Sequence, residues 1–225
     1  MPTHLRALIV ILVLSTIVFA LMRRTACDIA GTENYTRRRN LWFALTLAAF
    51  LAHNFWIYAV VAILLLKKAA RREANLPALY FFVLFTLPTN TIFIPGMGLI
   101  NYFFEISHDR ILALFVLLPA FLALNRQSGT LPFGRTGPDK VLAVYLLVTA
   151  LLNLRGDATV TAFLRQAFYL FINIFLPYFV ISRSLKNLQD FREALLSLVL
   201  VIMVIGVLGV FENLKTWLLY QAVLP

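Results

Sequence analysis

The chain has 225 residues, of which 61% are hydrophobic and 13% charged, with a mean hydropathy of +0.86. Soluble domains are closer to half apolar and a quarter charged, so this chain lacks the polar surface to face water and needs lipid as its solvent. The net charge of +10 does not indicate nucleic acid, because the Lys and Arg residues cluster between apolar runs and suit anionic headgroups. An integral membrane protein is predicted, with membrane lipids and no nucleic acid as partners.

Seven apolar segments in chain order predict an all-α, polytopic transmembrane bundle of six or seven spans in a single domain, residues 1–225. The segments are Leu5–Met22, Leu41–Leu66, Leu76–Ile94, Ile111–Leu124, Val141–Leu154, Phe163–Ile181 and Ala194–Phe211. The first is expected to be a retained span rather than a signal peptide, because arginines stand where cleavage would occur. The second, at about 1.5 Å per residue, is longer than a bilayer core of roughly 30 Å and is expected to tilt.

Lys and Arg in the connections give a provisional orientation with the N-terminus inside. The inner set is Arg6, Lys67, Lys68, Arg71, Arg72, Arg126, Arg135, Lys140, Arg183, Lys186 and Arg192. The outer set is Arg23, Arg24, Arg37, Arg38, Arg39, Arg110, Arg155, Arg165 and Lys215. Eleven against nine is a small bias, and it leaves an unusually basic outer face.

His53 and Asn54 lie at the middle of the second apolar segment. Hydrocarbon offers them no hydrogen-bond partner, so they must be satisfied inside the protein. One interpretation is a proton relay or a substrate-facing pair. The other is hydrogen bonding between helices, with Asn153 or Asn173 as partner, and it is favoured because the spans contain no carboxylate to complete a relay.

The segment "LPTNTIFIPGMGLINYFFEISHDR", residues 87–110, interrupts the third span with prolines and glycines. It is either a re-entrant turn that exposes backbone amides to an anionic headgroup or, as favoured here, the outer end of that span. Glu105, His108 and Asp109 follow at helical spacing. This spacing suits a divalent metal, but capping of the next helix by Ser107 or Asp109 explains it better. No metal and no cofactor are predicted.

Arg155 and Arg165 flank a short outer connection, and Arg165 begins an apolar helix. The planar guanidinium group offers several donors in a geometry that suits phosphate oxygens. Such arginines also reach lipid headgroups simply by extending along a helix end. For Arg165 the two interpretations stay open, whereas for Arg155 headgroup contact is favoured.

Two stretches resemble a known family. "FLPYFVISRSLKNLQDFREALLSLVLVIMVIGVLGVFENLKTWLLY" is similar to the middle of bacterial O-antigen ligases and polysaccharide polymerases. "RRRNLWFALTLAAFLAHNFWIY" and "LPALYFFVLFTLPTNTIFIPGMGLINYFFEISHDRILALFVLLPAF" resemble the N-terminal half of their exopolysaccharide-associated relatives. The resemblance covers most of the chain after residue 36 and consists of hydropathy with a few fixed polar positions.

This resemblance implies a glycosyl transfer in cell-envelope or exopolysaccharide biosynthesis at the bacterial inner membrane. A lipid-linked oligosaccharide on undecaprenyl diphosphate would be the donor, and basic residues would hold the departing diphosphate. The resemblance assigns that role to Arg165, and Arg155 and Arg110, on the same predicted side, complete the candidate set.

The family's catalytic loop belongs to its C-terminal half, which this chain resembles nowhere. The chain is therefore expected either to be a truncated or split gene product or to work with a second chain that supplies that half, and no catalytic residue is assigned. Two alternatives remain: a small multi-span transporter, with the interruption at 88–98 as its substrate site, and a non-catalytic scaffold subunit of an envelope glycan complex. A transporter would be expected to show paired interruptions, and the sequence shows one clear example.

Overall fold

The computed structural model describes residues 2–52, 54–86, 91–95, 102–153 and 159–223. Helices dominate, as predicted, and they pack as two compact units. Unit 1 comprises Met1–Asn90 and Leu185–Pro225, and unit 2 comprises Thr91–Ser184. Unit 1 contains both the beginning and the end of the chain, and its first and last long helices pack against each other.

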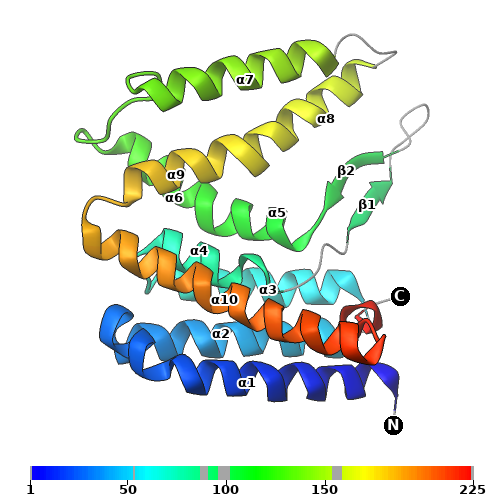
Figure 1. Ribbon diagram of the computed structural model, residues 1–225. Coiled ribbons are helices and arrows are strands. Elements are labelled where there is room, and N and C mark those ends of the chain that lie inside the picture. The colour runs from blue at the N-terminus through cyan, green and yellow to red at the C-terminus, as the bar shows by residue number, and fades with distance from the viewer. Residues whose placement is uncertain (1, 53, 87–90, 96–101, 154–158, 224–225) are drawn as a thin grey trace. The chain divides into compact units, whose positions relative to one another are not determined.

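Unit 1 is a bundle of long helices with a short 3-10 turn, η3, near the end of the chain (Figure 1). Its elements are α1 (Thr3–Ala30), α2 (Thr32–Leu51), α3 (Phe55–Ala70), α4 (Leu76–Leu84), α10 (Leu188–Lys215) and η3 (Leu219–Ala222). Helix α10 packs on α1 and on α4, and α1 packs on α2. At about 1.5 Å per residue, α1 and α10 each reach about 42 Å, enough to cross a hydrocarbon core.

The connection expected between the first two spans, residues 23–40, is helical. Only Gly31 separates α1 from α2, and its φ of 79° lies in the left-handed region that favours glycine. The amide of Gly31 closes α1 by donating to the carbonyl of Cys27 at 3.0 Å. The arginines of this region therefore lie on helices, and the chain reverses at a single residue.

The second apolar segment, predicted as one long span over residues 41–66, is instead a helical hairpin. Helix α2 ends at Leu51 and α3 begins at Phe55. The side chain of Asn54 caps α3 by accepting from the amide of Trp56 at 2.8 Å. Arg38, early in α2, contacts Glu73, just beyond α3, at 2.7 Å, so the two helices run antiparallel. A polar capping residue within the apolar run therefore favours the break between α2 and α3.

Aromatic side chains fill the centre of unit 1. Phe19 of α1 meets Trp42 of α2 edge-on at 5.5 Å between ring centroids and stacks on Phe82 of α4 at 5.7 Å. All three are fully buried or nearly so. Outward-facing positions of α1 and α10 are also apolar, including Ile17 and Ile202. A bundle that is apolar inside and outside is typical of a helix packed in lipid.

Unit 2 combines a pair of strands with three long helical segments (Figure 1). Its strands β1 (Ile92–Pro95) and β2 (Tyr102–Ile106) pair antiparallel, with Phe93 opposite Glu105. The helical elements are α5 (His108–Leu112), the π-turn η1 (Ala113–Leu117), α6 (Leu118–Arg126), α7 (Gly137–Asn153), α8 (Val160–Leu170), the π-turn η2 (Phe171–Phe175) and α9 (Leu176–Ser184). The strands depart from the all-α prediction, and the third span predicted over 76–94 is wrong, because α4 ends at Leu84. Residues 87–90 and 96–101 of the predicted interruption lie outside the described residues.

The two longest helical segments of unit 2 each contain a π-turn at the same place relative to a proline. Leu118 donates its amide to Ala113, five residues back, and Leu176 donates to Phe171 in the same way. Pro119 and Pro177 follow directly. A proline inside a helix removes one donor and presses on the carbonyl four residues earlier, and a wider turn relieves that contact.

Four helical segments are long and apolar enough to cross a membrane by length and composition: Thr3–Ala30, His108–Arg126, Thr161–Ser184 and Leu188–Lys215. They contain the first, fourth, sixth and seventh predicted segments. The predicted count of six or seven spans is not confirmed. The fold and composition together are those of a helical membrane protein.

Candidate functional site

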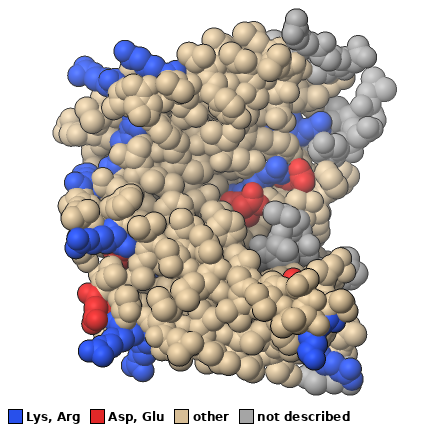
Figure 2. All heavy atoms as spheres, in the orientation of Figure 1, with Lys and Arg blue, Asp and Glu red and all other residues tan. Residues whose placement is uncertain are grey.

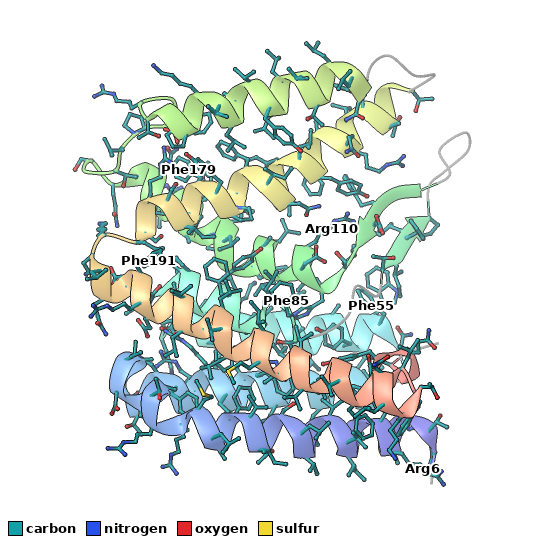
Figure 3. All side chains as sticks on the ribbon, viewed as in Figure 1. Arg6, Phe55, Phe85, Arg110, Phe179 and Phe191 are labelled. Carbon is teal, nitrogen blue, oxygen red and sulfur yellow. The ribbon has the colours of Figure 1, made fainter. Side chains whose placement is uncertain are left out.

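Arg110 lies in a cluster where β2, α5 and α8 of unit 2 meet (Figure 3). Its guanidinium group stacks on the ring of Tyr169, with 3.9 Å from Cζ to the ring centroid. One terminal nitrogen donates to the backbone carbonyl and, at 3.2 Å, to the carboxylate of Glu105. The amide of Glu105 in turn donates to the Tyr169 hydroxyl at 2.8 Å. A strand, a short helix and a long helix thus hold one arginine in place.

The donor capacity of Arg110 is only partly used. Its Nε is buried and finds no hydrogen-bond partner within the described part of the chain. The side chain keeps 13% of its surface exposed, and that of Glu105 keeps 25%. A buried donor without a partner costs stability unless something else satisfies it, so this arginine is suited to an additional acceptor.

Arg165 lies on α8 one turn before Tyr169, so the two residues share a helix face. Its side chain is half-buried. Next to Tyr169, Phe168 meets Phe104 of β2 at 5.0 Å between ring centroids. The structure therefore places Arg110 and Arg165 near the same stretch of α8, beside an aromatic contact.

The remaining predicted site residues separate from this cluster. Arg155 and His53 lie outside the described residues. Asn54 belongs to unit 1, where it is exposed and caps α3 between two helices. The prediction that it lies in the middle of a continuous span is therefore wrong. Asn153, considered as its hydrogen-bond partner, belongs to α7 of unit 2.

The carboxylate and histidine side chains near Arg110 do not assemble a metal site in the part of the chain that the structure describes. No group of three or more His, Cys, Asp or Glu side chains comes together there. Ser107 occupies the N-cap position of α5 without a side-chain capping bond, and His108 is buried. Glu105 lies on β2 and pairs with Arg110. The cluster therefore consists of an arginine, Arg110, and a carboxylate, Glu105, that would compete with an anionic ligand for it.

A second charged cluster, which sequence reasoning missed, lies inside unit 1. Arg38 is only 1% exposed. It bonds the two Glu73 carboxylate oxygens at 2.7 and 3.2 Å, Glu193 at 2.7 Å and the Ser197 hydroxyl at 3.3 Å. Asn75 completes the cluster by donating to Glu193 at 3.0 Å. We call these five residues the Arg38 network.

The Arg38 network is closed to ligands, because its partners come from the protein itself. Every guanidinium nitrogen of Arg38 has an acceptor. Burial raises the pKa of Glu73, but hydrogen bonds from Arg38 and Arg37 outweigh it, so the pKa lies below its ordinary value. The network joins α2, the α3–α4 connection and α10. Its role is to fasten the hairpin to the last helix.

Unit 2 contains a comparable internal pair, also missed. Arg183 of α9 bonds Asp139 of α7 at 2.7 Å, and Tyr178 donates its hydroxyl to the same carboxylate at 2.7 Å. Amides of Gly134 and Thr136 also donate to Asp139. The hydrogen bond from Arg183 is the main cause that holds the pKa of Asp139 well below its ordinary value.

One signal in the sequence pointed to both missed clusters. The chain has ten Asp and Glu residues against twenty Lys and Arg, and Glu73, Asp139 and Glu193 stand close to the ends of apolar segments. A rare carboxylate near lipid needs a cationic partner. What the sequence does not give is which of the many arginines each carboxylate chooses, because that depends on the unrecognised hairpin.

Comparisons of the chain with protein-family models, with curated proteins and with solved structures gave no match. The resemblance to O-antigen ligases and polysaccharide polymerases therefore stays a prediction.

Proposed function

We propose that this protein binds a lipid-linked diphosphate at the Arg110 cluster, as part of a membrane-embedded glycan polymerase or ligase. The observation that carries the proposal is the buried Nε of Arg110, which lacks an acceptor among the described residues. A second arginine, Arg165, lies one helical turn from Tyr169, the residue on which Arg110 stacks. Two arginines on neighbouring elements suit the several oxygens of a diphosphate better than one isolated cation would.

The aromatic residues of the cluster support this ligand class. Tyr169 holds the Arg110 guanidinium group over its ring, which restricts the directions of the planar donors. Phe104 is 39% exposed beside Phe168 and offers an apolar surface to the first units of a lipid chain. Charged and apolar surfaces side by side are what an amphipathic lipid requires.

The chemistry proposed for the whole assembly is the transfer of an oligosaccharide from undecaprenyl diphosphate to an acceptor hydroxyl. The bond between the sugar and the diphosphate breaks, and negative charge develops on the departing diphosphate. Preorganised arginine donors stabilise that charge. Arg110 and Arg165 are binding residues in this scheme, and a second chain supplies the base that takes the acceptor's proton. The proposed location is the bacterial inner membrane.

The test is equilibrium binding of undecaprenyl-diphosphate-linked oligosaccharide to the purified full-length protein, with undecaprenyl phosphate as the reference ligand. The diphosphate is expected to bind more tightly. Loss of one charge-assisted contact costs about 1.5–3 kcal/mol, so Arg110→Gln should weaken diphosphate binding by roughly tenfold to a hundredfold. Equal affinity for the two lipids would overturn the proposal.

Arg126→Gln provides the matched control. Arg126 is exposed and ends the same continuous helical segment that contains Arg110. It lies 16 residues from Arg110, about 24 Å along a helix. Binding by Arg126→Gln should equal that of the unmodified protein. A loss as large as that of Arg110→Gln would mean that the lipid responds to general positive charge.

A second candidate function, a small multi-span transporter, is favoured by one specific observation. Two spanning segments, His108–Arg126 and Thr161–Ser184, carry matching π-turns before Pro119 and Pro177, and the two π-turns contact each other. Paired interruptions in neighbouring spans are typical of the substrate sites of transporters, and π-turns are often found at functional sites. The sequence alone had shown only the interruption at 88–98.

Reconstituted vesicles separate the two functions. A transporter should move a fluorescent undecaprenyl-diphosphate lipid from the outer to the inner leaflet, and Pro119→Ala with Pro177→Ala should slow that movement because both helices regain a regular hydrogen-bond ladder. Lipid binding without movement would support the glycan-transfer role. Movement that the double variant leaves unchanged would exclude the paired π-turns as the transport site.

A further inference from the structure

The Lys and Arg residues of unit 1 gather at one end of its helices. This end, here called the basic end, is where α1 meets α2, where α3 meets α4 and where α10 begins. Eleven of the thirteen Lys and Arg residues of unit 1 lie there: Arg23, Arg24, Arg37, Arg38, Arg39, Lys67, Lys68, Arg71, Arg72, Lys186 and Arg192. The other two, Arg6 and Lys215, lie at the opposite ends of α1 and α10.

Hydrogen bonds show that these helix ends do share one face. Arg38 of α2 bonds Glu73, after α3, and Glu193 of α10, each at 2.7 Å. Gln189 of α10 donates to the carbonyl of Ile29, at the end of α1, at 2.7 Å. The sequence had placed the connection around Arg38 and the one around Glu73 at opposite membrane surfaces. That placement is wrong, because the α2–α3 hairpin returns the chain to its starting surface.

The basic end carries a large excess of positive charge that faces solvent. The basic end has five acidic residues: Asp28, Glu33, Glu73, Asp190 and Glu193. Five negative charges against eleven positive ones leave this end with a formal net charge of +6. Two of these carboxylates, Glu73 and Glu193, pair with Arg38 inside the buried network. Eight cations are exposed: Arg23, Arg24, Lys67, Lys68, Arg71, Arg72, Lys186 and Arg192. Figure 2 shows Lys and Arg atoms over the end where α1 meets α2.

We infer that the basic end is a docking surface for the anionic phospholipids of one leaflet, and that it lies at the cytoplasmic side of the membrane. Cytoplasmic connections carry the excess of Lys and Arg, and the anionic lipids of that leaflet attract them. The exposed apolar positions of α1, such as Ile9 and Ile17, continue into the hydrocarbon. The N-terminus and η3 then lie at the opposite surface, which reverses the N-inside orientation expected from sequence.

The single cysteine of the chain reports on this orientation directly. Cys27 lies in the last turn of α1 at the basic end and is partly exposed. A membrane-impermeant maleimide should label it in everted membrane vesicles and leave it unmodified in intact cells. Labelling in intact cells, or equal labelling in both preparations, would overturn the inference.

Two further thiols make the experiment independent of the reactivity of Cys27. In a Cys27→Ser background, Ala74→Cys places a thiol at an exposed position of the α3–α4 connection, also at the basic end. Thr3→Cys places one at the exposed beginning of α1. The first should be labelled only in everted vesicles and the second only in intact cells. Labelling of both from the same side would contradict the arrangement of unit 1.

The lipid partner is tested in vesicles of phosphatidylcholine with and without one-third phosphatidylglycerol. The probe is the relative association of spin-labelled phosphatidylglycerol and phosphatidylcholine with the protein at low salt. Neutralising Lys67, Lys68, Arg71 and Arg72 to Gln should lower the preference for phosphatidylglycerol by at least about tenfold, since each surface cation contributes about fivefold before screening. Arg6→Gln with Lys215→Gln, at the other end, should leave it unchanged. If the variant with all four substitutions still prefers phosphatidylglycerol as strongly as the unmodified protein does, these cations do not bind the leaflet.

Discussion

Arg38 and Arg110 are both arginines beside glutamates, yet the two units use them in different ways. Arg38 is buried, all its guanidinium nitrogens have protein acceptors, and its two glutamates come from distant parts of the chain. Arg110 faces one nearby glutamate, stacks on a tyrosine and keeps a donor without a partner in the described chain. Saturation of the donors, rather than residue type, thus separates an ion pair that fastens the fold from a candidate ligand site.

The largest effect is expected from breaking the Arg38 network. Arg38→Met leaves Glu73 and Glu193 buried with like charges and without their common partner. Loss of one partner of a buried ion pair costs about 3–5 kcal/mol. Thermal unfolding in detergent should show a clearly lowered midpoint, while diphosphate binding by the folded fraction stays intact.

Arg39→Met serves as the control for that change. Arg39 is adjacent but half-buried. Its guanidinium group bonds the neighbouring Asn40 at 3.0 and 3.3 Å and lies 6.0 Å from the centroid of the Tyr35 ring. Because these contacts are at the surface, removal of Arg39 should cost less than about 1 kcal/mol. If Arg39→Met destabilises the protein as much as Arg38→Met does, the buried network is not what fastens the hairpin.

Acid should weaken both internal ion pairs. The pKa values of Glu73 and Asp139 are lowered in the folded protein, so these groups contribute stability above their ordinary pKa of about 4. That contribution is lost as pH falls below this value through the lower folded pKa values. The unfolding midpoint should be nearly constant between about pH 5 and pH 8 and fall below about pH 4.

Glu73→Gln and Asp139→Asn separate the contributions to this acid response. Each variant should be less stable at neutral pH, because an uncharged amide is a weaker acceptor for Arg38 or Arg183. Each should also lose less stability between about pH 5 and pH 3, since the titrating group is gone. An acid response identical to that of the unmodified protein would assign it to other carboxylates.

A smaller change is expected at the open cluster, with the opposite sign. Glu105 competes with any anionic ligand for Arg110, at 3.2 Å. Glu105→Gln removes that charge and should tighten diphosphate binding by roughly threefold to tenfold, a free-energy change of about 1 kcal/mol. Equilibrium binding of the lipid measures it. Weaker binding would show that Glu105 orients Arg110 instead of competing for it.

The smallest expected contrast concerns Arg165 and Arg155. Arg165 shares a face of α8 with Tyr169 and is only half-buried. Solvent screens its contact, so Arg165→Ala should weaken diphosphate binding by up to about fivefold. Arg155→Ala should weaken it less, as expected of a residue that reaches general headgroups. Equal losses in the two variants would indicate headgroup contact at both positions.

Composition and hydropathy were enough to predict a helical membrane protein, and four of the seven apolar segments lie in helices able to span a bilayer. The α2–α3 hairpin was not predictable in the same way. In the sequence, Asn54 looks like a polar residue within a span, and only the structure shows that it caps α3 through its bond to the Trp56 amide. Because this reversal was missed, the sequence separated Arg37, Arg38 and Arg39 from the α3–α4 connection, and it did not reveal Glu73 as the partner of Arg37 and Arg38.

The candidate site was predicted in part. Arginine chemistry and the family resemblance singled out Arg165, and Arg110 entered the candidate set only by its predicted side. The role of Tyr169 was not predicted, since an aromatic residue in an apolar helix is ordinarily part of the core. The competing Glu105 lies on β2, which pairs with β1, and sequence reasoning had assigned the β1 stretch to the end of a span. The stacking partner Tyr169 lies on α8, far along the chain.

Photocrosslinking can locate the binding site of the diphosphate lipid on the protein. A diphosphate lipid with a photoreactive group beside the phosphates is bound to the full-length protein in excess phosphatidylglycerol, and the modified peptides are mapped. If the lipid binds at the Arg110 cluster, we expect adducts within residues 102–110 and 165–169. Adducts concentrated at the basic end of unit 1, where far more cations are exposed, would contradict it.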